Sequence, residues 1–169
     1  SDAPAAPTAA ATPEALLGGM RPVTPAMLRD PAPGDWLQWG RTYDGQNFSP
    51  LSRINRDNVK SLAQVWRTPI KGGLSMPTPI VHDGAMFLQT SPDTVLALNA
   101  ATGEVLWRHE HALAKGVSST MKMGLALSGG LVIVPTSDVH VIALNAKTGA
   151  MAWDHAIEIR PPAVMSTTL

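Results

Sequence analysis

The sequence predicts an all-β protein, because one strand–turn–strand unit occurs twice and both copies fit an antiparallel sheet. Residues 94–110, TVLALNAATGEVLWRHE, are matched 46 residues later by residues 140–156, HVIALNAKTGAMAWDHA. The match stays in register across the Asn and Thr-Gly of the turn and across the tryptophan that follows. A period in the forties, built from short strands and glycine turns, is typical of a β-propeller blade. We therefore predict two propeller blades.

A hairpin precedes each copy of the repeat and completes a blade. The first, residues 78–89, turns at residues 82–84, where Asp-Gly between apolar runs is a strong hairpin signal. The second, residues 125–135, turns at Ser-Gly-Gly, residues 128–130. Blade one, the connection and blade two are expected at about residues 76–111, 112–122 and 123–157.

A tryptophan stands at the same place in the last strand of each repeat, as Trp107 and Trp153. Trp66 has that place in residues 63–70, AQVWRTPI, which we interpret as an outer strand. A large ring at a fixed position can pack between neighbouring blades and bury apolar area. We predict structural docking roles for all three tryptophans. The strand at 63–70 would close a blade whose other strands lie elsewhere.

The segment before the blades divides into two parts. Residues 1–33 are rich in Ala, Pro and Thr, and we expect a mobile segment with one short helical turn at residues 25–28. Residues 34–169 are expected to hold the lead-in and the first blades. Residues 35–51 concentrate aromatic side chains and are expected to pack the lead-in across the propeller, with a ligand surface as the alternative. A turn of helix is expected at residues 55–62.

Composition excludes several classes of function. The 13 basic and 13 acidic residues leave no net charge, which argues against a nucleic-acid or anionic-membrane surface. There is no cysteine, so disulfides and thiolate metal sites are excluded. The sequence contains no run of about 20 apolar residues, so no membrane span is predicted. The Ala/Pro-rich start resembles a mature exported protein after signal-peptide removal, although a tag scar or a truncation is the alternative.

Two blades do not close a ring. Propellers usually contain about 4–8 blades. Two blades alone would leave sheet edges and an inter-blade face uncovered. The remaining blades are therefore expected in another chain or in sequence that is missing here.

The lead-in, GDWLQWGRTYDGQNFSPLSRINRDNVKSLAQVW, resembles the N-terminal part of the pyrroloquinoline-quinone (PQQ)-dependent alcohol dehydrogenases, the quinoproteins. The stretches TPIVHDGAMFL, ALNAATGEVLW and TSDVHVIALNAKTGAMAWD resemble their first two blades and tryptophan-docking repeats. The resemblance covers about residues 33–160. It implies the first two blades, plus a closing outer strand, of an eight-bladed periplasmic propeller with about four strands per blade.

The resemblance also implies a reaction. Family members oxidise an alcohol by hydride transfer to PQQ, which lies beside a calcium or lanthanide ion, and pass electrons to a cytochrome c. The family's metal ligands and catalytic aspartate lie in later blades, so this chain alone is expected to be inactive. Its expected partners are a polypeptide with the remaining blades, the alcohol and the cytochrome. The alternative is a non-catalytic propeller scaffold or binding subunit.

Few of the quinone contacts implied by the resemblance are present. Met76 stands where the family often has a glutamate bonded to the quinone, and Met123 stands at an arginine position. Neighbouring Lys122 could pair with a quinone carboxylate, with a solvated lysine as the alternative. A further threonine contact could fall on Thr167 or Thr168. Val117 and Ser118 stand where the family often has two vicinal cysteines. Met76, Met121 and Met123 could instead line an apolar quinone pocket.

The histidines suggest other chemistry. His109 and His111 share one face of a strand and could ligate a metal, but solvated side chains are the preferred interpretation. His82 in a hairpin turn and His140 at a strand start are expected at the surface. Asp138 could cap a turn or face the propeller channel.

Overall fold

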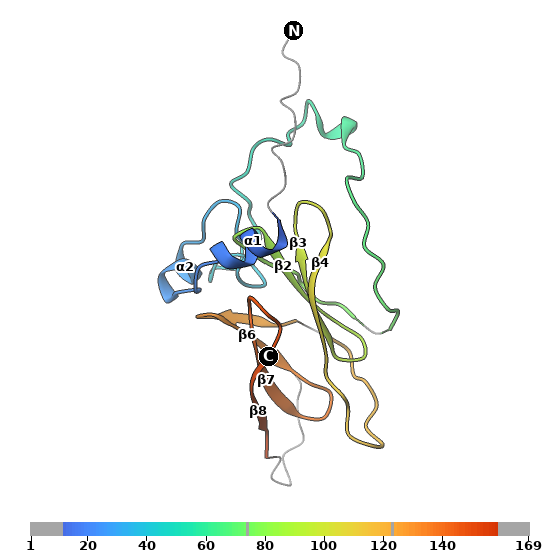
Figure 1. Cartoon of the computed structure of the whole chain (residues 1–169). Coiled ribbons are helices and arrows are strands. Elements are labelled where there is room, and N and C mark those ends of the chain that lie inside the picture. The colour runs from blue at the N-terminus through green and yellow to red at the C-terminus, as the bar shows by residue number, and fades with distance from the viewer. Residues whose placement is uncertain (1–11, 74, 123, 159–169) are drawn as a thin grey trace.

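The computed structural model describes residues 12–158 except residues 74 and 123, and it contains two four-stranded antiparallel sheets (Figure 1). In each sheet the strands follow one another in sequence order, as in a propeller blade. Both predicted blades are confirmed. The first sheet contains β1 (Ile80–His82), β2 (Ala85–Thr90), β3 (Thr94–Asn99) and β4 (Val105–Glu110), and the second contains β5 (Ala126–Ser128), β6 (Leu131–Pro135), β7 (His140–Asn145) and β8 (Met151–Ala156).

The turns follow from their residues. Asp83 and Gly84 join β1 to β2 and both have positive φ, 45° and 80°, as a tight two-residue hairpin requires. Gly129 and Gly130 occupy the corresponding positions between β5 and β6, and Gly129 has a positive φ of 56°. Both predicted hairpins are therefore confirmed.

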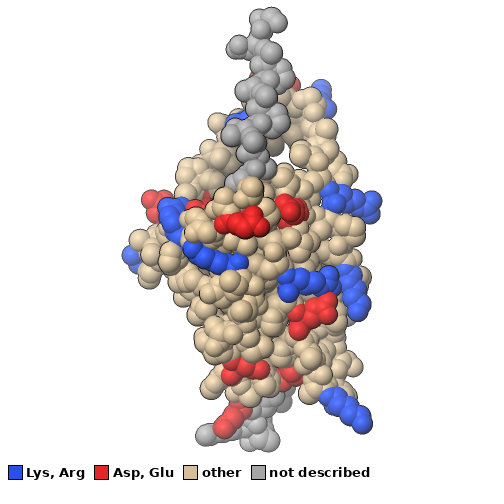
Figure 2. Space-filling model, in the orientation of Figure 1, with Lys and Arg blue, Asp and Glu red and all other residues tan. Residues whose placement is uncertain are grey.

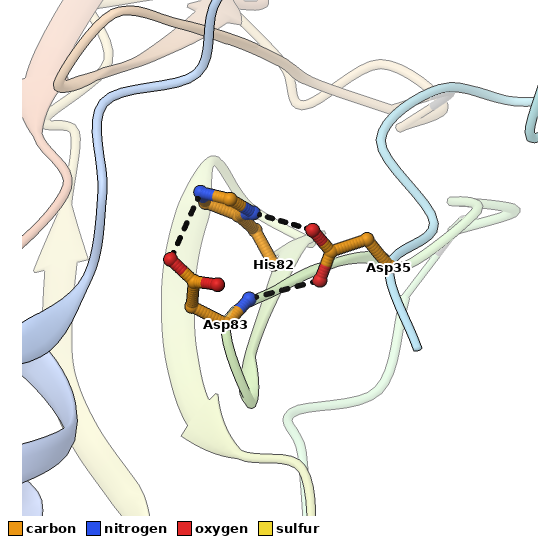
Figure 3. A group of neighbouring side chains, drawn as sticks. All are labelled: Asp35, His82 and Asp83. Atoms are coloured by element: carbon orange, nitrogen blue, oxygen red, sulfur yellow. Dashed lines mark hydrogen bonds and ion pairs between the residues drawn. The ribbon is translucent and has the colours of Figure 1, made fainter. Parts of the chain in front are cut away.

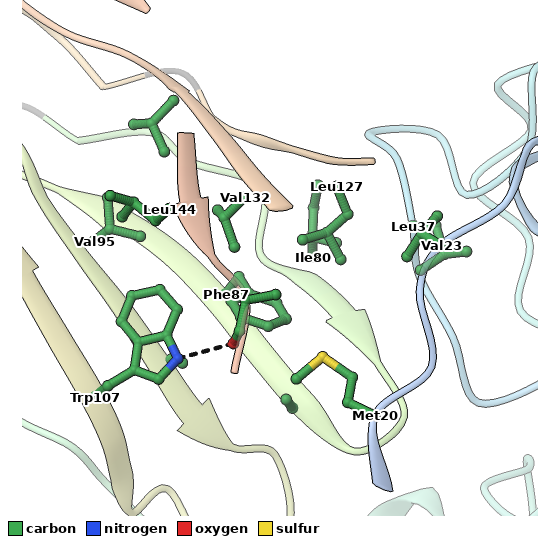
Figure 4. Packing of buried hydrophobic residues seen from close by; sticks show 14 of the residues in the cluster. Met20, Val23, Leu37, Ile80, Phe87, Val95, Trp107, Leu127, Val132 and Leu144 are labelled. Carbon is green, nitrogen blue, oxygen red and sulfur yellow. Dashed lines mark hydrogen bonds between the residues drawn. The ribbon is translucent and has the colours of Figure 1, made fainter. Parts of the chain in front are cut away.

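The core lies between the two sheets. Every residue of β3 is buried, because neighbouring strands flank it and side chains cover both of its faces. Phe87 and Trp107 from the first sheet join one buried cluster with Val132 and Leu144 from the second (Figure 4). By contrast, all six residues of β8 are exposed, so the far face of the second sheet is uncovered in the described part of the chain.

The N-terminal region differs from the expectation. Residues 12–33 are not a loose extension of the lead-in: they form α1 (Pro13–Gly19) and α2 (Pro25–Arg29), and both Met20 and Val23 are buried. Val23 exchanges two backbone hydrogen bonds with Gly129, at 2.7 and 2.9 Å. These helices and buried side chains differ from the mobile segment that the Ala/Pro-rich composition led us to expect over residues 12–33. Residues 1–11 lie outside the described part.

The helical turn predicted at residues 25–28 is confirmed as α2. The hydroxyl of Thr24 accepts a hydrogen bond from the backbone N–H of Met27 at 3.3 Å. Pro25 occupies the first turn, where its missing N–H leaves no helical bond unmade. None of the helices in the described residues is long and apolar enough to cross a membrane.

The lead-in is anchored at two points. Trp36 pairs with Val81 through two backbone hydrogen bonds of 2.8 and 2.9 Å, and Leu37 is buried in the core. Beyond them the chain arches away from the sheets through the 3₁₀ turn η1 (Val59–Ser61), as Figure 1 shows in blue-green and green. The turn of helix expected at 55–62 is thus confirmed. Residues 63–70 form no strand, because the described chain offers no neighbouring strand with which they pair.

Candidate functional site

Two tryptophans join consecutive structural units in the same way. The indole Nε1 of Trp66 donates to the carbonyl of Ala100 at 3.1 Å, and Trp107 Nε1 donates to the carbonyl of Ala146 at 2.9 Å. Each acceptor lies in the Asn-to-Gly turn that precedes the last strand of the next blade. The two bonds therefore tie the lead-in to blade one and blade one to blade two.

Glycine is required beneath each tryptophan ring. Gly103 and Gly149 end the two turns and have positive φ, 73° and 70°. A Cβ atom at Gly149 would lie 2.7 Å from Cε3 of Trp107, and one at Gly103 would likewise overlap the Trp66 ring. The Thr-Gly of the repeat is thus explained by both backbone conformation and ring contact.

Trp153 has the corresponding place in blade two but not the corresponding partner. Its side chain lies on β8, and the residue is 42% exposed. None of the described residues offers it the carbonyl that Trp66 and Trp107 each find. Within residues 12–158, blade two therefore presents a docking tryptophan that no further turn contacts.

The segments that precede the two blades meet at Lys122. Residues Ser75 and Lys122 form a parallel bridge, and the backbone N–H of Met76 donates to the carbonyl of Lys122 at 2.9 Å. Two positions singled out by their resemblance to quinone contacts are thus adjacent. Met76 is 67% exposed, and its thioether offers an apolar surface.

Lys122 itself is buried and ion-paired. The residue is 2% exposed, and its ammonium donates to the carboxylate of Asp93 and to the hydroxyl of Ser137. Asp93 comes from the turn between β2 and β3, and Ser137 from the turn between β6 and β7. The interpretation of Lys122 as a solvated lysine is therefore wrong. Its ion pair instead joins turns of both blades to the connection between them.

Lys122 and Met76 do not fit a site for the carboxylates of PQQ. PQQ carries carboxylates, which need cations or several N–H donors. The charge of Lys122 is already balanced by Asp93, and Met76 contributes no polar group. We therefore assign no carboxylate contact to Lys122. Met123, Thr167 and Thr168 lie outside the described residues.

A second polar cluster lies where the lead-in meets the first hairpin (Figure 3). His82 is fully buried: Nδ1 lies 2.9 Å from the Asp35 carboxylate, and Nε2 lies 2.9 Å from the carbonyl of Arg21. Asp35 also accepts from the backbone N–H of Asp83 at 3.0 Å. The expected surface position of His82 is therefore wrong, because its partners come from segments 47 and 61 residues away.

Asp35, His82 and Asp83 are also close enough together to hold a metal ion. Arg21 occupies part of that space, since its guanidinium bonds the carboxylate of Asp83 at 2.5 and 3.0 Å. Hydrogen bonding to Arg21 holds the pKa of Asp83 below its usual range. With each ligand atom already hydrogen-bonded, the cluster is a joint between the lead-in and blade one.

A third cluster links the blades at the other end of β4. His111 Nε2 lies 2.9 Å from the carboxylate of Asp138, which also accepts from the hydroxyl of Thr136 at 2.5 Å. His140 Nδ1 lies 2.6 Å from Asp154. His111 is therefore bonded rather than solvated, and Asp138 caps its turn. Burial lowers the pKa of His109. Among the described residues the one group that could hold a metal ion is Asp35, His82 and Asp83, so it includes neither His109 nor His111.

Comparison with known proteins places these features in a family. The family described as "Glucose/ethanol/alcohol dehydrogenase, beta-propeller domain", whose cofactor is PQQ, matches residues 36–151. Quinohemoprotein alcohol dehydrogenase ADH IIB of Pseudomonas putida is 38% identical over 130 residues, which cover 73% of this chain and 19% of that protein. The dehydrogenase subunit of the alcohol dehydrogenase (quinone) of Gluconacetobacter polyoxogenes is 37% identical over 61% of this chain and 15% of its own length.

Solved structures show the same similarity. Quinohemoprotein alcohol dehydrogenase ADHIIG of Pseudomonas putida HK5 superposes with a TM-score of 0.72 and 31% identity, over 84% of this chain and 22% of that one. A europium-containing methanol dehydrogenase superposes with a TM-score of 0.66 and 26% identity, over 78% and 24%. The chain thus spans less than a quarter of the length of these relatives. It belongs to the PQQ-dependent alcohol dehydrogenase family and forms part of the family's β-propeller.

Proposed function

We propose that the chain supplies the first two blades of an eight-bladed PQQ-dependent alcohol dehydrogenase, and that further polypeptide completes the ring. The observation that carries this proposal is the uncovered face of blade two. Trp153 repeats the position of Trp107, yet β8 is exposed along its whole length. A next blade with a Thr-Gly turn would cover that face as blade two covers Trp107.

The complete enzyme would oxidise an alcohol with PQQ and a calcium or lanthanide ion, and pass the electrons to a cytochrome c in the periplasm. The names of the relatives support this, since two are quinohemoproteins and one solved structure is a europium-containing methanol dehydrogenase. The metal ligands and the catalytic aspartate would lie in the remaining blades. This chain alone would then be inactive.

The part played by this chain is chiefly structural. The Lys122–Asp93 pair positions the backbone of Met76 next to the connection between the blades. We propose Met76 as an apolar contact of the quinone, together with Met123, Thr167 and Thr168 beyond the described residues. The quinone carboxylates would be held by residues of the remaining blades.

A non-catalytic scaffold is the second candidate function. One observation favours it. Lys122, the buried cation next to the positions that resemble the family's quinone contacts, is already neutralised by Asp93. A propeller that has lost its cation, its glutamate and its cysteines could still dock blades through the same tryptophans. The two candidates differ in whether the completed ring binds PQQ.

A chimera tests the proposed function. In it, residues 12–158 replace the aligned N-terminal region of ADH IIB of Pseudomonas putida, so that the relative supplies the remaining blades. We expect a cooperatively folded ring that binds PQQ with calcium and reduces an artificial electron acceptor when an alcohol is added. Intact ADH IIB is the control. A folded chimera without bound PQQ would support the scaffold, and a chimera that does not fold would contradict both functions.

A further inference from the structure

Arg41 is a buried cation that pairs with no carboxylate of the described residues. The residue is 9% exposed, and its Nη2 donates only to the backbone carbonyls of Pro31 and Ala32, at 3.1 and 3.4 Å. Within the part of the chain that the structure describes, its Nε has no hydrogen-bond partner. Among the described residues none of the ion pairs includes it, whereas the other buried cation, Lys122, pairs with Asp93. A buried charge without a counter-charge is unfavourable, so a partner from outside the described chain would stabilise it.

The loop holds this guanidinium in place before any partner arrives. Arg41 has a φ of 69°, in the left-handed region that non-glycine residues rarely adopt. Backbone bonding from Arg41 N–H to the carbonyl of Gln38 at 3.0 Å fixes the turn, and the Gln38 amide bonds the carbonyl of Leu28 at 3.0 Å. Strained backbone that is held this firmly is common at binding sites, where it keeps a side chain preorganised.

Exposed aromatic side chains flank Arg41 along the chain. Trp39, Tyr43 and Phe48 are 76%, 68% and 67% exposed. Residues 39–70 contain nine of the sixteen exposed large hydrophobic residues of the described chain. Tryptophan, tyrosine and arginine are the residues that most often dominate binding energy at protein interfaces. Such a concentration of exposed apolar surface indicates an interface.

The stretch that follows Arg41 is basic, and its residues 42–65 make no hydrogen bond to either sheet in the described chain. Residues 41–71 contain six basic and two acidic side chains, although the whole chain is neutral. Figure 2 shows Lys and Arg side chains at several places on this face, including the upper and right-hand parts, where Figure 1 places residues 41–71. The hydrogen bonds of residues 42–65 in the described chain stay within residues 40–66. An acidic partner surface would complement it.

We propose that Arg41 and its flanking aromatics, Trp39, Tyr43 and Phe48, dock a carboxylate-bearing apolar segment of the polypeptide that completes the ring. This rests on the proposed function, and it adds the chemistry of the contact. The occupant is protein, because three exposed aromatic side chains need apolar partners that a small anion lacks. A second copy of this chain would present the same basic stretch and repel it. The missing polypeptide, in contrast, accounts for more than three quarters of each relative's length.

The ADH IIB chimera also tests the docking site, through two substitutions at Arg41. Arg41→Gln removes the charge, so we expect a midpoint of thermal unfolding about 4 °C lower and faster proteolysis between residues 42 and 65. Arg41→Lys keeps the charge and adds an amine that a carbodiimide can couple to a carboxylate in contact with it. We expect mass spectrometry to find residue 41 joined to an Asp or Glu of the relative's blades. Arg108→Gln, on the exposed Arg108–Glu110 pair, is the matched control and leaves the midpoint unchanged.

The outcomes separate the two proposals. If the chimera folds and binds PQQ, but Arg41→Gln is neutral and Arg41→Lys forms no cross-link to the remaining blades, the docking site is refuted and the proposed function stands. A cross-link only to a second copy of residues 12–158 would also overturn it. If the chimera with Arg41 intact fails to fold, the proposed function fails and the docking site fails with it.

Discussion

Asp138 connects the turn before β7 to the end of blade one. Its carboxylate accepts from the Thr136 hydroxyl at 2.5 Å and lies 2.9 Å from His111 Nε2. Burial raises the pKa of this carboxyl, but the hydrogen bonds from Thr136 and His111 outweigh burial and lower it to about 2. The folded state therefore binds the Asp138 proton more weakly than the unfolded chain does.

This difference predicts a pH dependence. Since the folded pKa lies below the unfolded value of 3.8, Asp138 contributes stability above that value, and the contribution is lost as the pH falls through about 2. We expect the free energy of unfolding, measured with urea at a series of pH values, to fall less steeply below about pH 4 in Asp138→Asn than in the unsubstituted protein. Asp57→Asn, at an exposed position, should keep the original slope. Equal slopes for Asp138→Asn and the unsubstituted protein would contradict this assignment.

At the scale of elements, the Asn-to-Gly turn and the tryptophan form one docking unit. Trp107 from β4 covers Gly149 in the turn before β8 and bonds the carbonyl of Ala146. Trp66 does the same on blade one, although residues 63–70 form no strand. The docking contact therefore forms without the sheet around it, and it orients each unit against the next.

The glycine beneath Trp107 is predicted to be essential for this contact. Gly149→Ala places a Cβ atom 2.7 Å from the indole and forces alanine into a positive φ of 70°. We expect a loss of about 2 kcal/mol in the free energy of unfolding, measured by urea denaturation. Gly130→Ala is the control, because open space surrounds its Cβ position, and it should change stability by less than about 0.5 kcal/mol. The prediction fails if the two substitutions have the same effect.

Most of the fold could be predicted from local sequence patterns. The repeat fixed both blades, and the Asp-Gly and Gly-Gly turns located their hairpins, because strand alternation and turn conformation depend on adjacent residues. Contacts between side chains far apart in the sequence cannot be read from adjacent residues. His82 meets Asp35 and Lys122 meets Asp93 across 47 and 29 residues, so their burial was not evident from the sequence. The strand at 63–70 was mispredicted because a strand also requires a neighbour.

At the scale of the whole molecule, the chain forms part of the family's β-propeller. The two blades pack into one core. Three surfaces of the described residues are uncovered: the outer face of blade two, the docking tryptophan Trp153 and the basic, apolar lead-in. Each of these three surfaces lacks its counterpart within the described residues. All three would be covered if further blades closed the ring, which is the arrangement that the family membership supports.

Native mass spectrometry of the protein, purified without denaturant from its natural source, is the decisive test of whether further blades complete the propeller. We expect these residues to belong to a particle whose mass includes the remaining blades, and denaturation to release a mass consistent with PQQ and a metal ion. A particle with no mass beyond this chain would contradict the ring. A larger particle without PQQ would contradict the enzyme and leave the scaffold.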